Sequence, residues 1–335
     1  MSELTSIALA RQEPMADAPR SISASPDERH RHAFNATTLQ SALETLHQDG
    51  LLVLKQVVEV GHVDHLRQVM SAETRSILQS SQRADEYNQG VKSNILQNPP
   101  VHRADCLFDD VFFNPFVCQI ANAYLGSTPI INFMTANNAL AGTGGLRQPV
   151  HKDVPFRHPT CPFYCIANIV LSDFTPANGA TEFWLGSHAQ TTSADQVVCT
   201  PQTKRFRGQV PGRDPTCDVK GELVERRRKE RPPVLAECRR GDVVIRDLRT
   251  WHAGMPNHTT EDRLMVAIGY QAPWYPNHTQ RLFLPLEHAN FSMHHGGQQV
   301  EVRANFLGAD ELEQLWRNYD FTFEPSVGQE TRAQL

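Results

Sequence analysis

The chain has 335 residues, a length that fits one large domain or two of ordinary size. Apolar residues make up 40% of the chain and charged residues 21%, which is the composition of a globular protein with a buried core. A net charge of -5 disfavours nucleic acid or a membrane surface as the main partner.

The N-terminal segment does not have the pattern of a secretory signal. Residues 1–14 lack a basic start and a long apolar run, so a secretory signal is not expected. Residues 1–33 are rich in Ser, Ala, Pro, Asp and Arg without periodicity, which predicts a mobile tail. We therefore expect order to begin near Ala36 and a single domain to cover residues 36–325. The chain has no run of about 18 apolar residues, so no membrane-spanning helix is expected.

Three segments after the tail have the apolar spacing of amphipathic helices. The first, residues 35–50, has leucines at helical spacing, and Gly50 is a stop signal. A buried strand is predicted at 51–58 and a second helix at 62–80. The third helix is predicted at 114–126, where a proline stands early and a glycine ends the pattern.

After these helices the chain consists mainly of short apolar or alternating runs bounded by Gly, Pro, Asn and Asp, which are typical of strands. Such strands behind an N-terminal helical layer predict a mainly β fold, a sandwich or barrel with flanking helices. The predicted strands are 129–140, 162–174, 181–186, 241–249 and 263–273.

A polar segment at residues 199–240 interrupts these strands and contains the basic run ERRRKERPP. We interpret it as a polar insert, either a solvated surface helix with a loop or a lid beside the functional site. Nucleic-acid binding through this run is disfavoured by the acidic balance of the rest. A final helix is predicted from near Asp310, where it would pack on the core or on a second copy in a homodimer. His294 and His295 are interpreted as surface histidines, because neighbours on a strand point to opposite faces.

The most informative stretch is RQPVHKDVPFRHP, residues 147–159, which places His151 and Asp153 two residues apart. Side chains of a strand alternate between its two faces. In an extended segment His151 and Asp153 therefore point the same way, while Lys152 points elsewhere and is expected to face solvent. Two ligands of one metal ion can then come from a single short strand.

A third ligand is predicted after the strand at 241–249, where His252 precedes a turn signal. Arg263 lies eleven residues later and opens the next strand. The alternate residues that begin with Arg263 form the less apolar face of that strand and are expected to line a pocket. The bulkier face is expected to form the core between two sheets, and it consists of Leu264, Val266, Ile268 and Tyr270.

Two histidines and one carboxylate on one face of a metal ion leave three positions open, which is the arrangement of non-heme Fe(II) oxygenases. The open positions can take a bidentate 2-oxo acid and O2. The far carboxylate of that co-substrate needs a partly buried cation, and the planar fork of Arg263 matches a carboxylate. Halogenation is disfavoured, because a halide needs the position that Asp153 fills.

These residues lie in motifs that resemble the phytanoyl-CoA dioxygenase (PhyH-like) family of Fe(II)/2-oxoglutarate oxygenases, and most closely its fungal-type branch of natural-product enzymes. The resemblance covers residues 39–276, and its most specific pieces are QPVHKD, NGATEFWLGSH and GDVVIRDLRTWHAGMPN with Arg263. It implies a double-stranded β-helix, a cupin-like jelly roll. It also implies that His151, Asp153 and His252 bind the iron, and that Arg263 pairs with the distal carboxylate of 2-oxoglutarate.

The resemblance implies further contacts with the co-substrate. Gln148 and Thr181 occupy positions that contact 2-oxoglutarate in similar enzymes. Asn168, on an alternating strand, is expected to line the same pocket. Trp251, beside a predicted ligand, is expected to be a packing residue.

The predicted function is that of a dioxygenase that uses Fe(II), 2-oxoglutarate and O2 to oxidise, by default to hydroxylate, a C–H bond of a small natural-product substrate in secondary metabolism. Two alternatives stay open: an acyl-CoA hydroxylase of phytanoyl-CoA type, and a non-catalytic jelly-roll binding protein. Seven cysteines with a single close pair favour reduced thiols and a cytoplasmic location.

Overall fold

A large sheet forms the centre of the computed structural model, which describes residues 18–79, 87–88, 92–204, 209–278, 282–290 and 299–315. Its strands are β1 (Ser21–Ser23), β2 (Leu51–Lys55), β3 (Asn94–Gln97), β4 (Ile130–Ala139), β5 (Tyr164–Val170), β10 (Val243–Asp247), β12 (Met265–Gln271) and β14 (Glu301–Val302). They lie in the order β1-β2-β10-β5-β12-β4-β14, and β3 also pairs with β4. The central pairs are antiparallel, so strands remote in sequence lie side by side.

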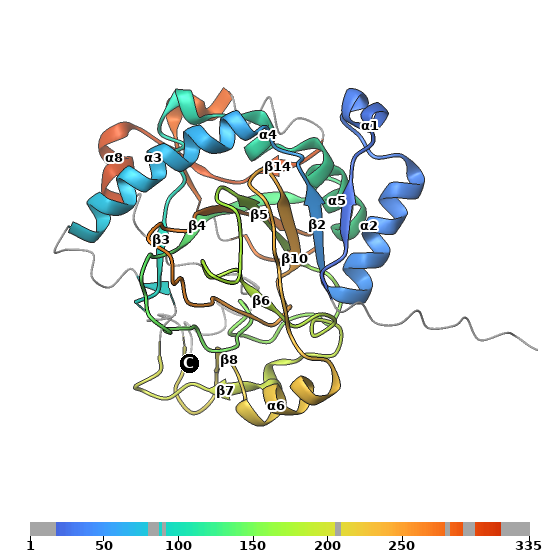
Figure 1. The fold of residues 1–335 in the computed structure, drawn as a ribbon, viewed down its shortest axis with the longest axis vertical. Coiled ribbons are helices and arrows are strands. Elements are labelled where there is room, and N and C mark those ends of the chain that lie inside the picture. The colour runs from blue at the N-terminus through green and yellow to red at the C-terminus, as the bar shows by residue number, and fades with distance from the viewer. Residues whose placement is uncertain are drawn as a thin grey trace, which may run out of the picture.

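A smaller sheet faces the large one. It contains β6 (Glu182–Phe183), β9 (Val234–Leu235) and β11 (His252–Ala253), and a separate pair is formed by β7 (Gln196–Val198) and β8 (Pro215–Val219). The segment at His151 joins the two groups, because it forms bridges with His252 on one side and with Asp218 on the other. The molecule is therefore mainly β, with two facing sheets as predicted (Figure 1).

Helices cover the large sheet on the side away from the small sheet (Figure 1). They are α1 (Pro26–Arg31), α2 (Ala36–Asp49), α3 (Val60–Gln79), α4 (Asp109–Phe112) and α5 (Pro115–Leu125). The helices predicted at 35–50, 62–80 and 114–126 are confirmed as α2, α3 and α5. Each of α2 and α5 begins at an asparagine N-cap whose side chain accepts backbone N–H groups of the first turn.

The expectation that the bulky face of β12 forms the core between the two sheets is wrong. Leu264, Val266, Ile268 and Tyr270 pack in one apolar cluster with helix residues such as Leu46 and Phe116, not between the sheets. Met265 instead packs in a cluster with Phe183 of the small sheet and Ala236, the residue after β9. The bulky face is covered by helices, so the less apolar face of this strand lines the space between the sheets, where a pocket was expected.

The tail prediction for residues 1–33 also differs from the structure. Strand β1 pairs in parallel with β2, and α1 follows it. Ser25 and Glu28 form a reciprocal capping box at the start of α1. Its two hydrogen bonds stabilise the first turn of this six-residue helix. Residues 1–17 and residue 325, the predicted end of the domain, lie outside the described residues.

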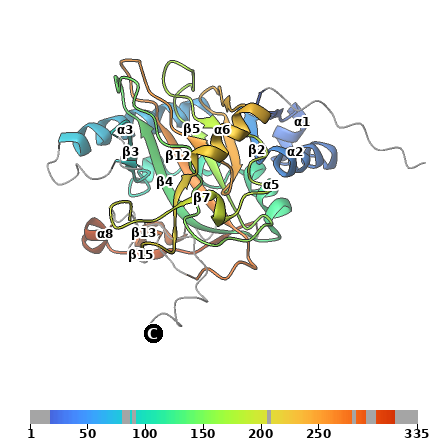
Figure 2. The same cartoon turned by 90° about the horizontal axis from the view of Figure 1, so that it is seen from below.

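Residues 199–240 are not a simple insert. Strand β9 belongs to the small sheet and β8 reaches its edge through the bridge between Asp218 and His151, while α6 (Gly221–Glu230) and the described parts of the loop between β7 and β8 lie on the surface. Figure 2, seen from below, shows α6 and β7 in front of the central strands. The sequence signal failed here because each strand is short and pairs with residues remote in the chain.

The C-terminal part adds β13 (Phe283–Pro285), which pairs in parallel with β15 (Asn305–Leu307), and α8 (Ala309–Leu315). Helix α8 agrees with the helix predicted from near Asp310, and its Leu312 is buried. Short 3-10 helices cover Ala104–Cys106, Ser193–Asp195 and Leu286–His288. His294 and His295 lie outside the described residues. In the part of the chain that the structure describes, no helix is long and apolar enough to cross a membrane.

Candidate metal centre

Three predicted ligand residues converge between the two sheets. One ligand atom from each of His151, Asp153 and His252 lies within 4.8 Å of the others. The Nε2 atoms of His151 and His252 are each 3.7 Å from an oxygen of Asp153. Ligand atoms about 2 Å from a shared ion lie about 3–4 Å apart, so this spacing suits a bound metal.

Backbone carbonyls orient both imidazoles. The Nδ1 atom of His151 is 2.8 Å from the Pro149 carbonyl oxygen, and that of His252 is 3.0 Å from the Thr250 carbonyl oxygen. A carbonyl oxygen can only accept, so Nδ1 carries the proton in each ring. Each Nε2 then presents a lone pair toward Asp153 and the centre, as a metal ligand must.

Burial keeps the two imidazoles neutral. It lowers the pKa of His151 and lowers the pKa of His252 well below its usual value. Burial alone would raise the pKa of Asp153, but the Arg246 guanidinium holds it below its usual range. The centre therefore offers two neutral nitrogen donors and one carboxylate, a donor set that suits Fe(II).

Sequence reasoning missed Arg246, which contacts this centre. It lies on β10 with only 6% of its surface exposed, and its Nη2 donates to Oδ2 of Asp153. Its Nη1 is buried and has no hydrogen-bond partner in the described part of the chain. The sequence feature that could have indicated Arg246 is a charged residue within the otherwise apolar strand VVIRD.

Arg263 is a buried cation without an anion. Only 1% of its surface is exposed, and its Nε and Nη1 have no hydrogen-bond partner among the described residues. Its guanidinium carbon lies 4.3 Å from the centre of the Phe174 ring, and burial lowers its pKa to about 10. An unpaired buried charge is costly, so an anionic ligand is the natural partner for this side chain.

The three other predicted pocket residues are buried as well. Gln148 accepts a hydrogen bond from the Gly254 N–H at 2.9 Å, and its Nε2 has no partner within the described residues. Asn168 lies on β5 opposite Ala267, and its Oδ1 likewise lacks a described partner. Thr181 immediately precedes β6 of the small sheet. Free polar atoms on Gln148 and Asn168 are suited to contacts with a bound polar molecule.

Lys152 is not solvent-facing as expected; none of its surface is exposed. It points away from its two neighbours, His151 and Asp153, but a loop covers it. Its Nζ is 3.0 Å from His158 Nε2 and donates to Thr191 and Thr192 of that loop. Its direction follows from strand alternation, whereas its burial depends on a loop remote in sequence.

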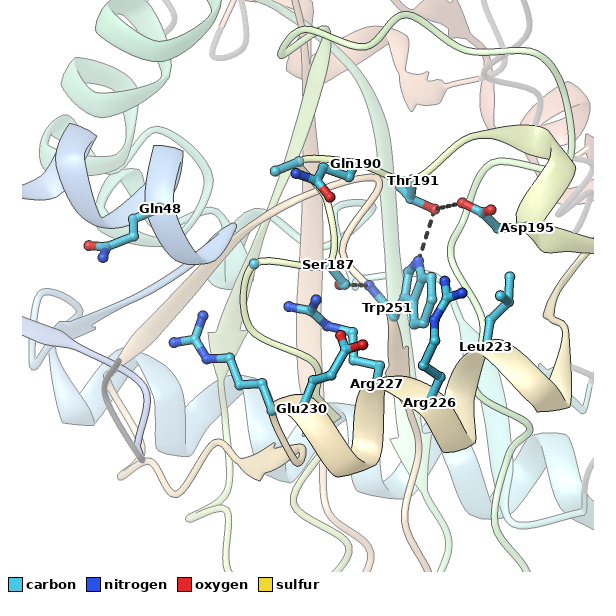
Figure 3. A pocket seen from close by; sticks show the side chains of 13 residues that line it. Gln48, Ser187, Gln190, Thr191, Asp195, Leu223, Arg226, Arg227, Glu230 and Trp251 are labelled. Carbon is cyan, nitrogen blue, oxygen red and sulfur yellow. Dashed lines mark hydrogen bonds between the residues drawn. The ribbon is translucent and has the colours of Figure 1, made fainter. Parts of the chain in front are cut away.

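A polar cavity of about 560 Å³ lies on the other face of the small sheet (Figure 3). Trp251 lines it and packs with Trp184 and with Val224 of α6, so its role in packing is confirmed. His252 follows Trp251 and points to the opposite face. Helix α6 is thus separated from the triad by the small sheet, which favours a surface helix over a lid.

The cations of this cavity are largely occupied within the protein. The Nη2 atom of Arg227 donates to the Leu185 carbonyl oxygen at 2.6 Å, and Arg231 pairs with Asp49 at 2.9 Å. The Glu230 carboxylate lies beside Arg227, and Arg226 stands farther along α6 beside Trp251 (Figure 3). Arg231 of this cavity is therefore neutralised by Asp49, while Arg227 is held by a backbone carbonyl and its buried Nε has no partner among the described residues.

A second group of side chains with metal-ligand chemistry consists of His65, Asp105 and Cys106. Asp105 already accepts two hydrogen bonds from the Arg103 guanidinium. Burial raises the pKa of Cys106 to about 11, so it stays a thiol. A committed carboxylate and a protonated thiol make this group a poor metal site.

Comparison with known proteins identifies the family. The model of the family described as Phytanoyl-CoA dioxygenase (PhyH) matches residues 46–265, and the chain belongs to this family. A curated relative is Dioxygenase af480 of Aspergillus fumigatus, which is 26% identical over 172 residues. That match covers 50% of this chain and 46% of the relative, so the chain spans about half the length of this relative.

Solved structures show the fold. The crystal structure of the epimerase SnoN in complex with Fe3+, alpha ketoglutarate and nogalamycin RO matches with a TM-score of 0.51 at 18% identity. The match covers 71% of this chain and 84% of that one. The structure of EvdMO1 matches with a TM-score of 0.50 at 19% identity, over 70% of this chain and 50% of that one. The predicted jelly roll, a double-stranded β-helix, is confirmed.

Proposed function

We propose that this protein is a non-heme Fe(II)- and 2-oxoglutarate-dependent dioxygenase that hydroxylates a C–H bond of a small natural product. One observation supports this most strongly: the His-Asp-His group, with both histidines buried, adjoins the apolar cluster of Phe174 and Phe183 on which Arg263 packs, and this buried arginine has no ion-pair partner among the described residues. The two features meet two separate requirements, a metal with open positions and a cation for the co-substrate.

The residues would divide the work as follows. His151, Asp153 and His252 hold Fe(II), and the guanidinium of Arg263 binds the distal carboxylate of 2-oxoglutarate. Gln148, Thr181 and Asn168 contact the co-substrate. When bound, iron, 2-oxoglutarate and O2 supply the oxidising chemistry, while the apolar surroundings exclude bulk water.

The alternatives are less well supported. An acyl-CoA substrate would need cations for its phosphates, and the basic run on α6 lies across the small sheet from the triad. A non-catalytic binding protein would have no use for an ionised carboxylate between two oriented imidazoles. We further propose a cytoplasmic location, since all seven cysteines are unpaired.

Anaerobic titration with Fe(II) tests the proposal. The wild-type protein should bind one Fe(II) per chain and develop a weak visible band only when 2-oxoglutarate is added. His151→Ala, Asp153→Ala and His252→Ala should each abolish the band, whereas His65→Ala, in the second group of potential ligands, should retain it. A screen for succinate release over a panel of natural products then identifies the substrate. Retention of iron and the band by all three triad variants would overturn the proposal.

A further inference from the structure

Arg246 occupies a position where a charged side chain needs an explanation. Its neighbours on β10, Val244 and Ile245, are buried and apolar, and it is itself nine-tenths buried. Burying a guanidinium is costly unless an anion and hydrogen bonds compensate for the lost water. Among the described residues its ion-pair partner is Asp153, the carboxylate of the triad.

The contact leaves the two oxygens of Asp153 in different surroundings. Each oxygen lies 3.7 Å from the Nε2 atom of one triad histidine, Oδ1 from His151 and Oδ2 from His252, but only Oδ2 accepts a hydrogen bond from a described residue, Arg246. No described lysine or other arginine pairs with this carboxylate. The buried Nη1 of Arg246 is also without a described partner, so the guanidinium has a further donor for a molecule bound beside Asp153.

The number of oxygens that Asp153 uses decides how many positions remain on the metal. In a six-coordinate ion, two histidines and one carboxylate oxygen leave three positions. A carboxylate that binds through both oxygens leaves only two. The proposed co-substrate needs two positions and O2 needs one, so binding through both oxygens would block a required position.

We propose that Arg246 is a positioning residue that holds Oδ2 of Asp153, so that this carboxylate binds the metal through Oδ1 alone and three positions stay open. The inference rests on the proposed function, because it requires a metal at the triad. It adds a residue from the large sheet to a centre whose other members come from the small sheet and its edge.

Bound Mn(II) reports the number of open positions directly, because each exchangeable water on the ion enhances the relaxation of solvent protons. The wild-type protein with Mn(II) and no 2-oxoglutarate should behave as an ion with three exchangeable waters. In Arg246→Met the carboxylate is free to bind through both oxygens, so the relaxation enhancement per bound ion should fall by about a third. Arg246→Lys, which retains a charged donor, should restore most of the wild-type value.

Arg263→Met is the matched control, since it removes another buried arginine that no ion pair connects to Asp153. It should keep the wild-type enhancement when 2-oxoglutarate is absent. Circular dichroism checks the fold of each variant, and Arg246→Gln, too short to reach Oδ2, replaces a methionine variant that fails to fold. An unchanged enhancement in the folded Arg246 variants overturns this inference alone. Absence of Mn(II) and Fe(II) binding by the wild-type protein overturns the proposed function as well.

Discussion

Two basic side chains, Lys152 and His158, meet beneath the loop that carries Thr191. The Nδ1 atom of His158 donates to the Pro159 carbonyl oxygen at 2.8 Å, so its Nε2 is left to accept from the Lys152 ammonium. Burial and, after it, the charge on Lys152 together lower the pKa of His158 to about 4. Protonation of this imidazole would place two cations in contact.

This contact predicts a specific loss of stability in acid. An unfolded histidine titrates near pH 6.5, whereas folded His158 titrates near pH 4. Between these pH values the unfolded chain binds more protons than the folded chain. The free energy of unfolding therefore increases as the pH rises and decreases as the pH falls. Between pH 7 and 4.5 the wild-type protein should lose on the order of 1–3 kcal/mol more than His158→Gln.

Urea denaturation of both proteins at the two pH values measures the difference. His30→Gln, at an exposed position of α1, is the control and should follow the wild-type curve. Parallel pH profiles for the wild-type protein and His158→Gln would show that His158 is not held neutral.

For single residues the sequence predicts the direction of a side chain better than its burial and its contacts. Two-residue spacing placed His151 and Asp153 on one side and Lys152 on the other, because alternation is a local property of a strand. The burial of Lys152 and the pairing of Arg246 with Asp153 depend on segments remote in the chain. No local pattern contains that information.

The C-terminal end of α2 is built around Gly50, whose φ is +69°. A Cβ atom at this position would lie 2.5 Å from Nδ1 of His188 and 2.6 Å from Oγ1 of Thr250. Thr250 also donates to the Gly50 carbonyl oxygen at 2.9 Å. The glycine thus ends the helix and lets the segment that leads to His252 pack directly against it.

Gly50→Ala is expected to destabilise the protein strongly. The left-handed conformation alone costs an alanine about 1–2 kcal/mol. The two clashes add a packing term, since overpacking typically costs about 1–3 kcal/mol. Gly212→Ala isolates the first contribution, because Gly212 has a φ of +82° and open space around its Cβ position.

Chemical denaturation of the two variants separates the contributions. Gly50→Ala should lose about 2–5 kcal/mol in free energy of unfolding, and Gly212→Ala about 1–2 kcal/mol. Equal losses would mean that His188 and Thr250 move aside without cost.

Periodicity predicts the long elements and fails for the short ones. The apolar spacing of α2, α3 and α5 is visible because each helix buries one continuous face, and the apolar runs of β4, β5 and β12 are visible because these strands are buried along nearly their whole length. Strands β1, β8 and β9 have at most five residues, and remote partners define them. The sequence shows that the bulky face of β12 is buried but not which element packs on it. For this reason the face was predicted to pack on the second sheet, whereas helices cover it.

The two sheets together create the candidate centre. The small sheet and its edge provide His151, Asp153 and His252, while Arg246 and Asn168 belong to the large sheet. Arg263 lies just before β12 and bridges to Ala139. Because these residues come together only in the folded chain, a ligand that binds them should stabilise the whole molecule.

Ligand-induced stabilisation therefore tests the assembled site in one experiment. Each ligand should add about 2.7 kcal/mol to the free energy of unfolding when it is present at a hundred times its Kd. For the wild-type protein we expect one increment from Mn(II) and a second when 2-oxoglutarate is added to the Mn(II) form. His151→Ala should lose both increments, whereas Arg263→Met should keep the first and lose the second.

The unliganded proteins give the sharpest comparison. Arg263 is buried with no anionic partner among the described residues, so its charge destabilises the unliganded fold. Replacement by methionine, which is apolar and flexible, should leave unliganded Arg263→Met at least as stable as the wild-type protein. The same variant should be the less stable of the two once Mn(II) and 2-oxoglutarate are present. Denaturation with and without ligands measures this reversal, and a variant that is less stable in both states would assign Arg263 to the support of the fold instead of the binding of the co-substrate.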